Sequence, residues 1–453
     1  MEPEHGYGWL GAVIPADARR FRVTDAALAA VLSDAGAQLV GAEPDVEIAP
    51  VRELRGDAAL SIAVLGRPAR AGRPFPVRVV RRLVNSLRVR LGARRARRIV
   101  RRLGYTTVRV LMWDHQMVLR AATRGGAFSR ARLIEYLPQR ALVIAGGPEH
   151  ARTLLDEALA EASGATGLVL EASSPSVRAE LLISGTKGGV LRIAVGPGRR
   201  QILNQSAALA TLRAAHPPAL VADRVPWELA SGKCGVAEWS LEARLPGARP
   251  RPPVSDRLLA DCTDFLVALH SACPSDAGGN TLLEKAEVVV DACPEEAQVV
   301  RALAERLEAA LADLPRGFGH GDFFHGNLLA DRGRLVGVVD WDAAGPGRLP
   351  LLDLLHLRHA TQALADVDWG PRLVQRLLPW AHAGGDDVAR SYCQRLGFSL
   401  DPTRLEALAL AYWLDYVSSQ LRSHAYRLAQ PRWLERNISL VLRVVGQDTA
   451  VRS

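Results

Sequence analysis

The sequence predicts an α+β protein in which a small strand-rich lobe precedes a larger helical lobe, with a separate α/β module in front of both. Three observations support this prediction. The 453 residues exceed one ordinary domain, short strand-like runs gather between residues 168 and 195, and helical periodicity dominates after residue 255. We expect an N-terminal α/β module over 1–163, a strand-rich lobe over 164–248 and a helical lobe over 249–453.

The N-terminal module carries the basic excess of the chain. The net charge of the whole chain is +9, whereas residues 1–149 contain 25 arginines against 13 acids, a charge of +12. Fifteen of these arginines lie between Arg67 and Arg109, where aliphatic residues recur at helical spacing. This pattern predicts a basic amphipathic helix. Its arginines either contact an anionic surface such as lipid or nucleic acid, or simply face solvent while the aliphatic side packs onto the module.

The other elements of this module alternate between the two periodicities. The pattern predicts helices over 24–35 and 148–162 and strands over 45–48, 59–65, 104–112 and 141–145. No glycine-rich nucleotide fingerprint follows the strands at 45–48 and 59–65, so the sequence gives no support for a dinucleotide site in the module.

Composition narrows the class of protein further. The five cysteines are odd in number and form no CxxC pair, so neither a disulfide framework nor a zinc site is indicated. No apolar run reaches the length of a membrane span. We expect a soluble protein of the cytoplasm with reduced thiols.

The strand-rich lobe is predicted from three short runs and the segments that follow them. Strands are expected over 168–171, 179–184, 189–195 and 239–247, with a turn over 186–189 and a helix over 201–212. Helices are then expected over 255–271, 294–314, 351–364, 371–383, 402–428 and 432–445.

Three polar residues between 317 and 342 have the pattern of a phosphoryl-transfer site. Asn327 follows Asp322 by five positions, and a predicted hairpin over 328–339 brings Asp340 back toward Asn327. Phosphoryl transfer is mostly positioning and charge neutralisation. Asp322 can accept the proton of an acceptor hydroxyl, and the oxygens of Asn327 and Asp340 are the hard ligands that Mg²⁺ prefers.

These residues closely resemble a known family. His320-Gly-Asp322-Phe-Phe-His-Gly-Asn327, followed by Val338-Val-Asp340-Trp341-Asp342, is similar to the catalytic and metal-binding segments of the aminoglycoside phosphotransferase and choline kinase family. The resemblance implies a two-lobed protein-kinase-like fold over about 165–445. It also implies a kinase that uses Mg²⁺ and ATP or GTP to phosphorylate a hydroxyl of an aminoglycoside, amino alcohol, sugar or related metabolite. In such a site His320, Asp342 and Asp353 would have structural roles.

The small lobe departs from the family pattern at two positions. Arg192 stands where the family carries a phosphate-contacting lysine, and Gln205 stands where its glutamate partner would be. The resemblance also assigns nucleotide contacts to Ser174, in a loop without glycine, and to Glu242 in the hinge strand. The two departures keep open a second interpretation, a weakly active or non-catalytic kinase-like scaffold whose basic module binds a polyanion or membrane surface.

The sequence alone does not identify the acceptor. The resemblance assigns the acceptor pocket to the helices after Asp353, and the candidate lining residues there are Trp369, Tyr412, Trp413, Asp415 and Tyr416. The aromatic residues among them are equally typical of helix-packing core.

Overall fold

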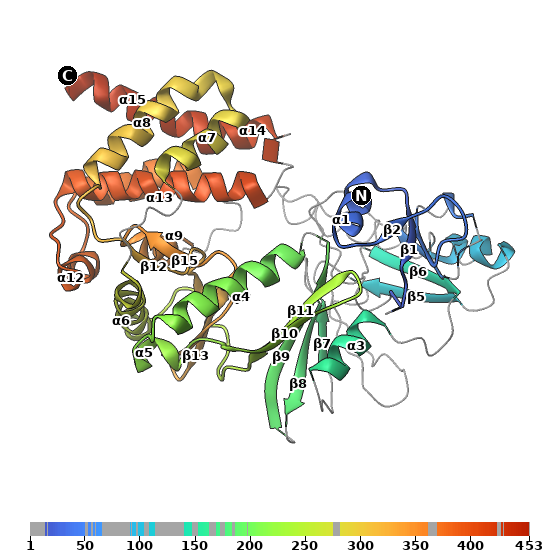
Figure 1. Cartoon of the computed structure of the whole chain (residues 1–453). Coiled ribbons are helices and arrows are strands. Elements are labelled where there is room, and N and C mark those ends of the chain that lie inside the picture. Colours follow the sequence, from blue (N-terminus) through green and yellow to red (C-terminus); the bar gives the residue numbers. More distant parts are fainter. Residues whose placement is uncertain are drawn as a thin grey trace. The chain divides into compact units, whose positions relative to one another are not determined.

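This computed structural model of the chain (Figure 1) describes residues 14–15, 17–49, 53–55, 58, 60–65, 91, 93–96, 98–103, 108–113, 140–146, 153–162, 169–172, 177–183, 186–196, 198–274, 281–360, 369–423, 427–428 and 430–452. Contacts divide the chain into two compact units. The first comprises Met1–Leu203 and Trp227–Arg244, and the second Asn204–Pro226 and Leu245–Ser453. The mixed helix and strand content agrees with the predicted α+β class.

A six-stranded mixed sheet forms the N-terminal part of the first unit (Figure 1). Its strands are β1 (Arg20–Val23), β2 (Gln38–Leu39), β3 (Val46–Ile48), β4 (Leu60–Leu65), β5 (Val108–Trp113) and β6 (Arg140–Gly146), in the order β2-β1-β3-β4-β6-β5. The first four run parallel, and β6 pairs antiparallel with both β4 and β5. Helix α1 (Ala26–Asp34) begins after Asp25, whose carboxylate caps it by accepting the Leu28 N–H at 2.9 Å.

Only the end of the predicted arginine-rich helix falls on described residues. Residues 93–96 and 98–102 are helical, and this segment buries Ala93, Ala96 and Val100. Its arginines at 94, 95, 98, 101 and 102 are exposed. The segment is therefore amphipathic, as both interpretations of the arginines require. The preceding stretch, 66–90, lies outside the described residues.

A five-stranded antiparallel sheet forms the rest of the first unit. It contains β7 (Val169–Ala172), β8 (Val177–Ile183), β9 (Thr186–Val195), β10 (Glu228–Cys234) and β11 (Ala237–Ala243), in the order β10-β11-β9-β8-β7. The turn predicted at 186–189 is wrong. Ile183 pairs with Thr186 and Leu181 with Gly189 across the ladder, so 186–189 belongs to β9. Strand β10 was not predicted from the sequence, because its ELASGKC run lacks the β-branched residues that are typical of strands.

Two helices accompany this sheet. Helix α3 (Leu154–Glu161) is anchored by side chains of the last two strands: Trp239 Nε1 donates to a Glu161 carboxylate oxygen at 2.9 Å, and the Cys234 thiol lies 3.3 Å from the Leu154 carbonyl oxygen. Helix α4 (Gly198–Ala214) follows β9 directly and carries the chain into the second unit.

The second unit is mainly helical (Figure 1). Its described helices are α5 (Ala219–Ala222), α6 (Asp256–Ala272), α7 (Leu282–Ala292), α8 (Ala297–Ala310), α9 (Leu352–Ala360), α10 (Trp369–Arg372), α11 (Leu378–His382), α12 (Asp387–Arg395), α13 (Pro402–Ser423), α14 (Pro431–Leu434) and α15 (Leu440–Arg452). Wider π-helical turns at Leu373–Leu377 and Glu435–Ser439 join α10 to α11 and α14 to α15. No described helix combines the length and the apolar character that a membrane span requires.

Two short antiparallel ladders interrupt these helices. β12 (Gly317–Gly319) pairs with β15 (Gly345–Arg348), and β13 (Leu328–Asp331) pairs with β14 (Arg334–Val338). The second ladder is the predicted hairpin. Its two-residue turn, Arg332 and Gly333, has positive φ angles of 48° and 74°, the combination that matches the twist of a tight hairpin.

Candidate active site

The loop between β12 and β13 holds the predicted catalytic residues, and a carboxylate at the start of α9 fixes its first turn. Asp353 accepts the backbone N–H of His320 at 2.6 Å and that of Gly321 at 2.8 Å, one at each carboxylate oxygen. Gly321 has φ of +81°, and a Cβ there would lie 2.4 Å from the Ala343 carbonyl oxygen. The turn into Asp322 therefore needs both the Asp353 carboxylate and a glycine.

His320 lies in the core beneath this loop. Its side chain is fully buried, its Nε2 lies 3.1 Å from the Val339 carbonyl oxygen, and its Nδ1 lies 3.3 Å from the backbone nitrogen of Asp322. These partners fit one neutral tautomer, in which Nε2–H donates and Nδ1 accepts. Burial lowers the pKa of His320, in keeping with a neutral ring. His320 thus connects the loop to the end of the hairpin.

Asp322 is held at both carboxylate oxygens and remains accessible. Asn327 Nδ2 donates to Asp322 Oδ2 and to its backbone oxygen, both at 2.9 Å, and His356 Nε2 lies 3.1 Å from Oδ1. The Asp322 side chain is 46% exposed. Burial raises its pKa, but the hydrogen bond from His356, the largest of the lowering effects, helps to bring the pKa below its usual value. Asp322 is therefore an ionised carboxylate at neutral pH, able to accept a hydrogen bond from an incoming hydroxyl.

The hairpin brings the two predicted metal ligands together along the backbone. Leu328 pairs with Val338, and the Val339 N–H donates to the Asn327 carbonyl oxygen at 2.9 Å, so Asp340 emerges beside Asn327. The Asn327 amide nitrogen donates to Asp322, so the amide presents its oxygen as the remaining polar atom. Asp340 has a left-handed φ of 71°, a conformation that Asp tolerates better than most residues. Its carboxylate and the Asn327 oxygen are hard ligands that fit Mg²⁺.

Among the residues that the structure describes, no group of three or more His, Cys, Asp or Glu side chains could enclose a metal ion. A metal at Asn327 and Asp340 would thus be held by few protein oxygens and would rely on phosphate oxygens and water. Mg²⁺ in nucleotide sites is usually bound in this way.

Trp341 anchors the segment that contains Asp340. Its ring is fully buried, with centroids 4.8 Å from His320 and 6.3 Å from Phe265. Its indole N–H donates to the Val338 carbonyl oxygen, and its backbone N–H donates to Gln205 Oε1 at 3.2 Å. Gln205, predicted to act on the nucleotide side, therefore also connects α4 to the segment that contains Asp340. Asp342, the second acid of this segment, is partly buried.

Arg192, the proposed phosphate contact, has an acidic neighbour in its own sheet. Arg192 on β9 lies beside Ser240 on β11, and Glu242 follows two residues further along the same face. The Arg192 Nε to Glu242 Oε1 distance is 3.1 Å, with side chains only 7% and 4% exposed. Sequence reasoning named both residues but missed their pairing, because the register that joins them depends on the sheet. Ser174 lies outside the described residues.

His356 is the site residue that sequence reasoning missed altogether. It lies one helical turn after Asp353 on α9, so both side chains face the catalytic loop. Its other ring nitrogen, Nδ1, lies 3.1 Å from the Tyr412 hydroxyl on α13. The only available signal was the three-residue spacing from Asp353, which no motif singles out.

Comparison with known proteins finds similarity to phosphotransferases in this region. The model of the phosphotransferase enzyme family matches residues 178–392, which include the catalytic loop, the hairpin and α9. Homoserine kinases of Pseudomonas aeruginosa strains LESB58 and PAO1 are each 31% identical to the chain over 231 residues. That match spans 47% of this chain and 61% of theirs.

Solved aminoglycoside phosphotransferases are also similar to the chain. The ADP-bound enzyme APH(2'')-Ib has a TM-score of 0.41 at 17% identity, covering 63% of this chain and 95% of that one. The enzyme APH(3'')-Id from Streptomyces rimosus, in complex with ADP and streptomycin, has a TM-score of 0.39 at 16% identity, covering 54% and 92%.

Three of the five candidate acceptor residues cluster around His356. Ring centroids lie 4.5 Å apart for Trp369 and Tyr416 and about 6 Å from His356 for Trp369, Tyr412 and Tyr416. Trp413 is absent from these contacts. It is 1% exposed, and its indole N–H donates to the Asn437 carbonyl oxygen at 2.8 Å, in the packing between helices.

Asp415, the remaining acceptor candidate, forms a bridge between two cations. Lys285 Nζ lies 2.8 Å from Oδ1, and Arg348 Nη1 lies 3.3 Å from Oδ2. Burial alone would raise the pKa of Asp415, but these two cations lower it to about 2. Arg348 also donates to the Ala343 carbonyl oxygen beneath the catalytic loop. The charge of the Asp415 carboxylate is thus already balanced by two cations.

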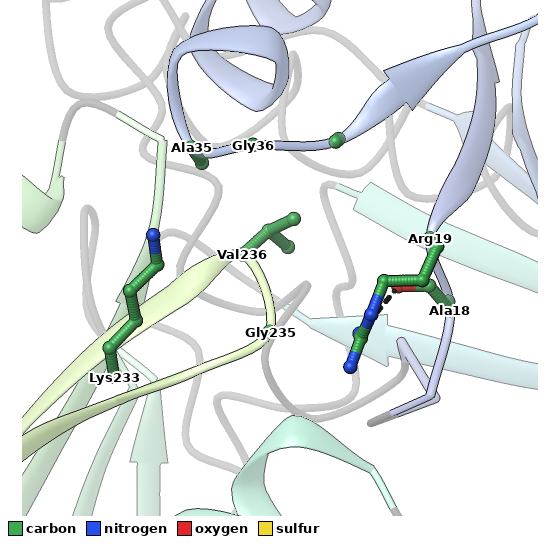
Figure 2. Close-up of a pocket in the computed structure, with 8 residues that line it drawn as sticks. Ala18, Arg19, Ala35, Gly36, Lys233, Gly235 and Val236 are labelled. Carbon is green, nitrogen blue, oxygen red and sulfur yellow. Dashed lines mark hydrogen bonds between the residues drawn. The ribbon is translucent and has the colours of Figure 1, made fainter.

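A cavity of about 370 Å³ lies in the first unit (Figure 2). Its described lining consists of Ala18, Arg19, Ala35, Gly36, Ala37, Lys233, Gly235 and Val236. Figure 2 shows Lys233 and Val236 reaching it from the β10–β11 hairpin and Arg19 from the start of β1. This lining contains two cations and no carboxylate, so it provides neither a base nor a metal ligand for phosphoryl transfer.

Proposed function

We propose that this protein is a small-molecule kinase that transfers the γ-phosphoryl group of ATP or GTP to a hydroxyl, with Mg²⁺. The observation that carries the proposal is the Asp322 carboxylate. It is ionised, accessible and fixed by Asn327 and His356, and the hairpin returns Asp340 to the side of Asn327. We also interpret the five-stranded sheet and the helical unit as the two lobes of a kinase-like fold.

Each residue has a defined part in the proposed reaction. Asp322 accepts the hydrogen bond of the acceptor hydroxyl and aligns its oxygen with the γ-phosphorus. It takes the proton as the new O–P bond forms and the bond between the γ-phosphorus and the departing ADP or GDP breaks. Asn327 and Asp340 hold Mg²⁺, which when bound neutralises charge on the phosphate oxygens. Arg192, its charge balanced by Glu242, contacts the nucleotide phosphates, with Gln205 and Ser174 as further nucleotide-side residues. Asp353 and His320 keep the loop in place.

The charges around the site favour an acceptor that is not strongly cationic. A polycationic aminoglycoside needs acidic partners, yet Asp415 is bridged by Lys285 and Arg348. The similarity to homoserine kinases fits an acceptor that carries a carboxylate near its hydroxyl. We therefore propose a small hydroxylated amino acid or amino alcohol in preference to an aminoglycoside.

An acceptor screen tests this proposal. The full chain would be incubated with MgATP or MgGTP and, separately, L-homoserine, choline or kanamycin, and the products read by mass spectrometry. We expect a phosphorylated product with L-homoserine or choline, and its loss in Asp322→Asn at an unchanged melting temperature. The matched control is Asp313→Asn, because Asp313 is exposed on the surface. Undiminished transfer by Asp322→Asn would remove the assigned base, and no transfer to any acceptor would favour the scaffold interpretation.

A further inference from the structure

A hydrogen-bonded chain leads from the catalytic carboxylate into the helical core. Asp322 Oδ1 lies 3.1 Å from His356 Nε2, and His356 Nδ1 lies 3.1 Å from the Tyr412 hydroxyl. The three residues come from the catalytic loop, α9 and α13. The resemblance that identified Asp322 does not include His356 or its contact with Tyr412.

The proton positions in this chain follow from its two ends. Tyr412 is 3% exposed, and burial raises its pKa well above the ordinary value, so the phenol keeps its proton. Because the Asp322 carboxylate can only accept, a neutral His356 ring carries its proton on Nε2, and Nε2–H donates the hydrogen bond to Asp322. Nδ1 of that tautomer accepts the hydrogen bond of the Tyr412 O–H. One neutral tautomer satisfies both contacts.

The surroundings fix the orientation of the imidazole. His356 is 9% exposed and touches the rings of Phe324, Trp369 and Tyr416 at centroid distances of about 6 Å. Rotation of the ring would break the contacts with both Asp322 and Tyr412. Two further groups affect the imidazole electrostatically. One is Asp415 on α13, and the other is His359, whose pKa is lowered to about 3 by burial and by Arg372. His359 is neutral, and Lys285 and Arg348 balance Asp415.

We propose that His356, oriented by Tyr412, is a positioning residue that holds the Asp322 carboxylate in the plane required to align the acceptor hydroxyl. Asn327 fixes Oδ2 and His356 fixes Oδ1, so losing His356 lets the carboxylate rotate about the χ2 torsion. This inference rests on the proposed kinase function. It predicts that His356 affects kcat, because the alignment is needed at the moment of transfer, and leaves the binding of nucleotide and acceptor nearly unchanged.

The tautomer can be measured without any acceptor. In the full chain labelled with ¹⁵N-histidine, the resonances of His356 are assigned by their absence in His356→Gln. At neutral pH we expect Nε2 protonated and Nδ1 unprotonated, and in Tyr412→Phe we expect loss of the single tautomer. A proton on Nδ1 in the wild type, or an unchanged spectrum in Tyr412→Phe, would overturn the proposal.

Kinetics with MgATP and L-homoserine provide the second test. We expect His356→Phe to lower kcat about 10- to 100-fold, with both KM values within about threefold of wild type. His356→Gln should recover most of kcat, since its amide N–H can still donate to Asp322. The control His382→Gln changes an exposed histidine on α11 and should match the wild type. Full kcat in His356→Phe, or a rise in KM at constant kcat, would contradict the assignment. A wild type without transfer would count against the proposed acceptor class, while the tautomer measurement would still decide the role of His356.

Discussion

Replacing Asp353 by asparagine tests how the catalytic loop is held. The carboxylate accepts two backbone N–H groups, from His320 at 2.6 Å and Gly321 at 2.8 Å. An asparagine retains one acceptor oxygen and directs its NH₂ group at the other N–H, so one hydrogen bond is lost and two donors face each other. Since a hydrogen bond to a charged group contributes about 1.5–3 kcal/mol, we expect the variant to lose roughly 2–3 kcal/mol of stability.

Two measurements check this expectation. For a folded unit of this size, the lost stability corresponds to a melting temperature lower by roughly 4–12 °C. A displaced loop would misplace Asp322, and a misplacement of about 1 Å lowers kcat on the order of 100-fold. Asp387→Asn is the control, because Asp387 is 99% exposed on the first turn of α12. An Asp353→Asn protein that melts with the wild type and keeps its kcat would refute the anchoring role of this carboxylate.

Two further predictions concern buried charges. Glu242→Gln removes the negative charge that lies 3.1 Å from the buried Arg192, so we expect a loss of roughly 3 kcal/mol in urea unfolding. The exposed Glu287→Gln should change stability little, and equal stabilities of the two variants would show that the pair is dispensable. Asp415, whose pKa is lowered from 3.8 to about 2, stabilises the fold fully above its unfolded pKa and loses this contribution as pH falls toward 2. This contribution is about 2 kcal/mol, and Asp415→Asn should lack it, so the stability of the variant should fall less than that of the wild type as the pH is lowered. If variant and wild type had identical pH profiles of stability, Asp415 would not form the stabilising bridge with Lys285 and Arg348.

The geometry of the segment from Asp322 to Asp340 could be predicted from the sequence because it depends on residues that are close together in the chain. The five-residue spacing of Asp322 and Asn327 lies within one loop, and the hairpin between Asn327 and Asp340 is marked by Gly333 and by β-branched residues. Long helices such as α6 and α13 were also predicted within a few residues at most ends, since their apolar periodicity extends over many turns.

The parts that the sequence did not reveal depend on contacts between distant segments. Glu242 meets Arg192 only through the register of β9 and β11, and His356 meets Tyr412 only after α9 packs beside α13. Helices α7 and α12 were not predicted from the sequence. The separation of Trp413 from the aromatic cluster also follows from helix packing, since adjacent helical residues point about 100° apart.

The central claim is that Asn327 and Asp340 hold a metal for transfer to a hydroxyl oriented by Asp322. The most direct measurement is Mg²⁺-dependent transfer of the γ-phosphoryl group of ATP or GTP into a small-molecule extract of the source cells, read by mass spectrometry. Asp340→Ala is compared with Asp331→Ala, an exposed residue of the same hairpin. The account predicts a phosphorylated product with wild type and Asp331→Ala and none with Asp340→Ala. A product formed equally by Asp340→Ala, or no product together with no Mg²⁺-dependent nucleotide binding, would contradict it.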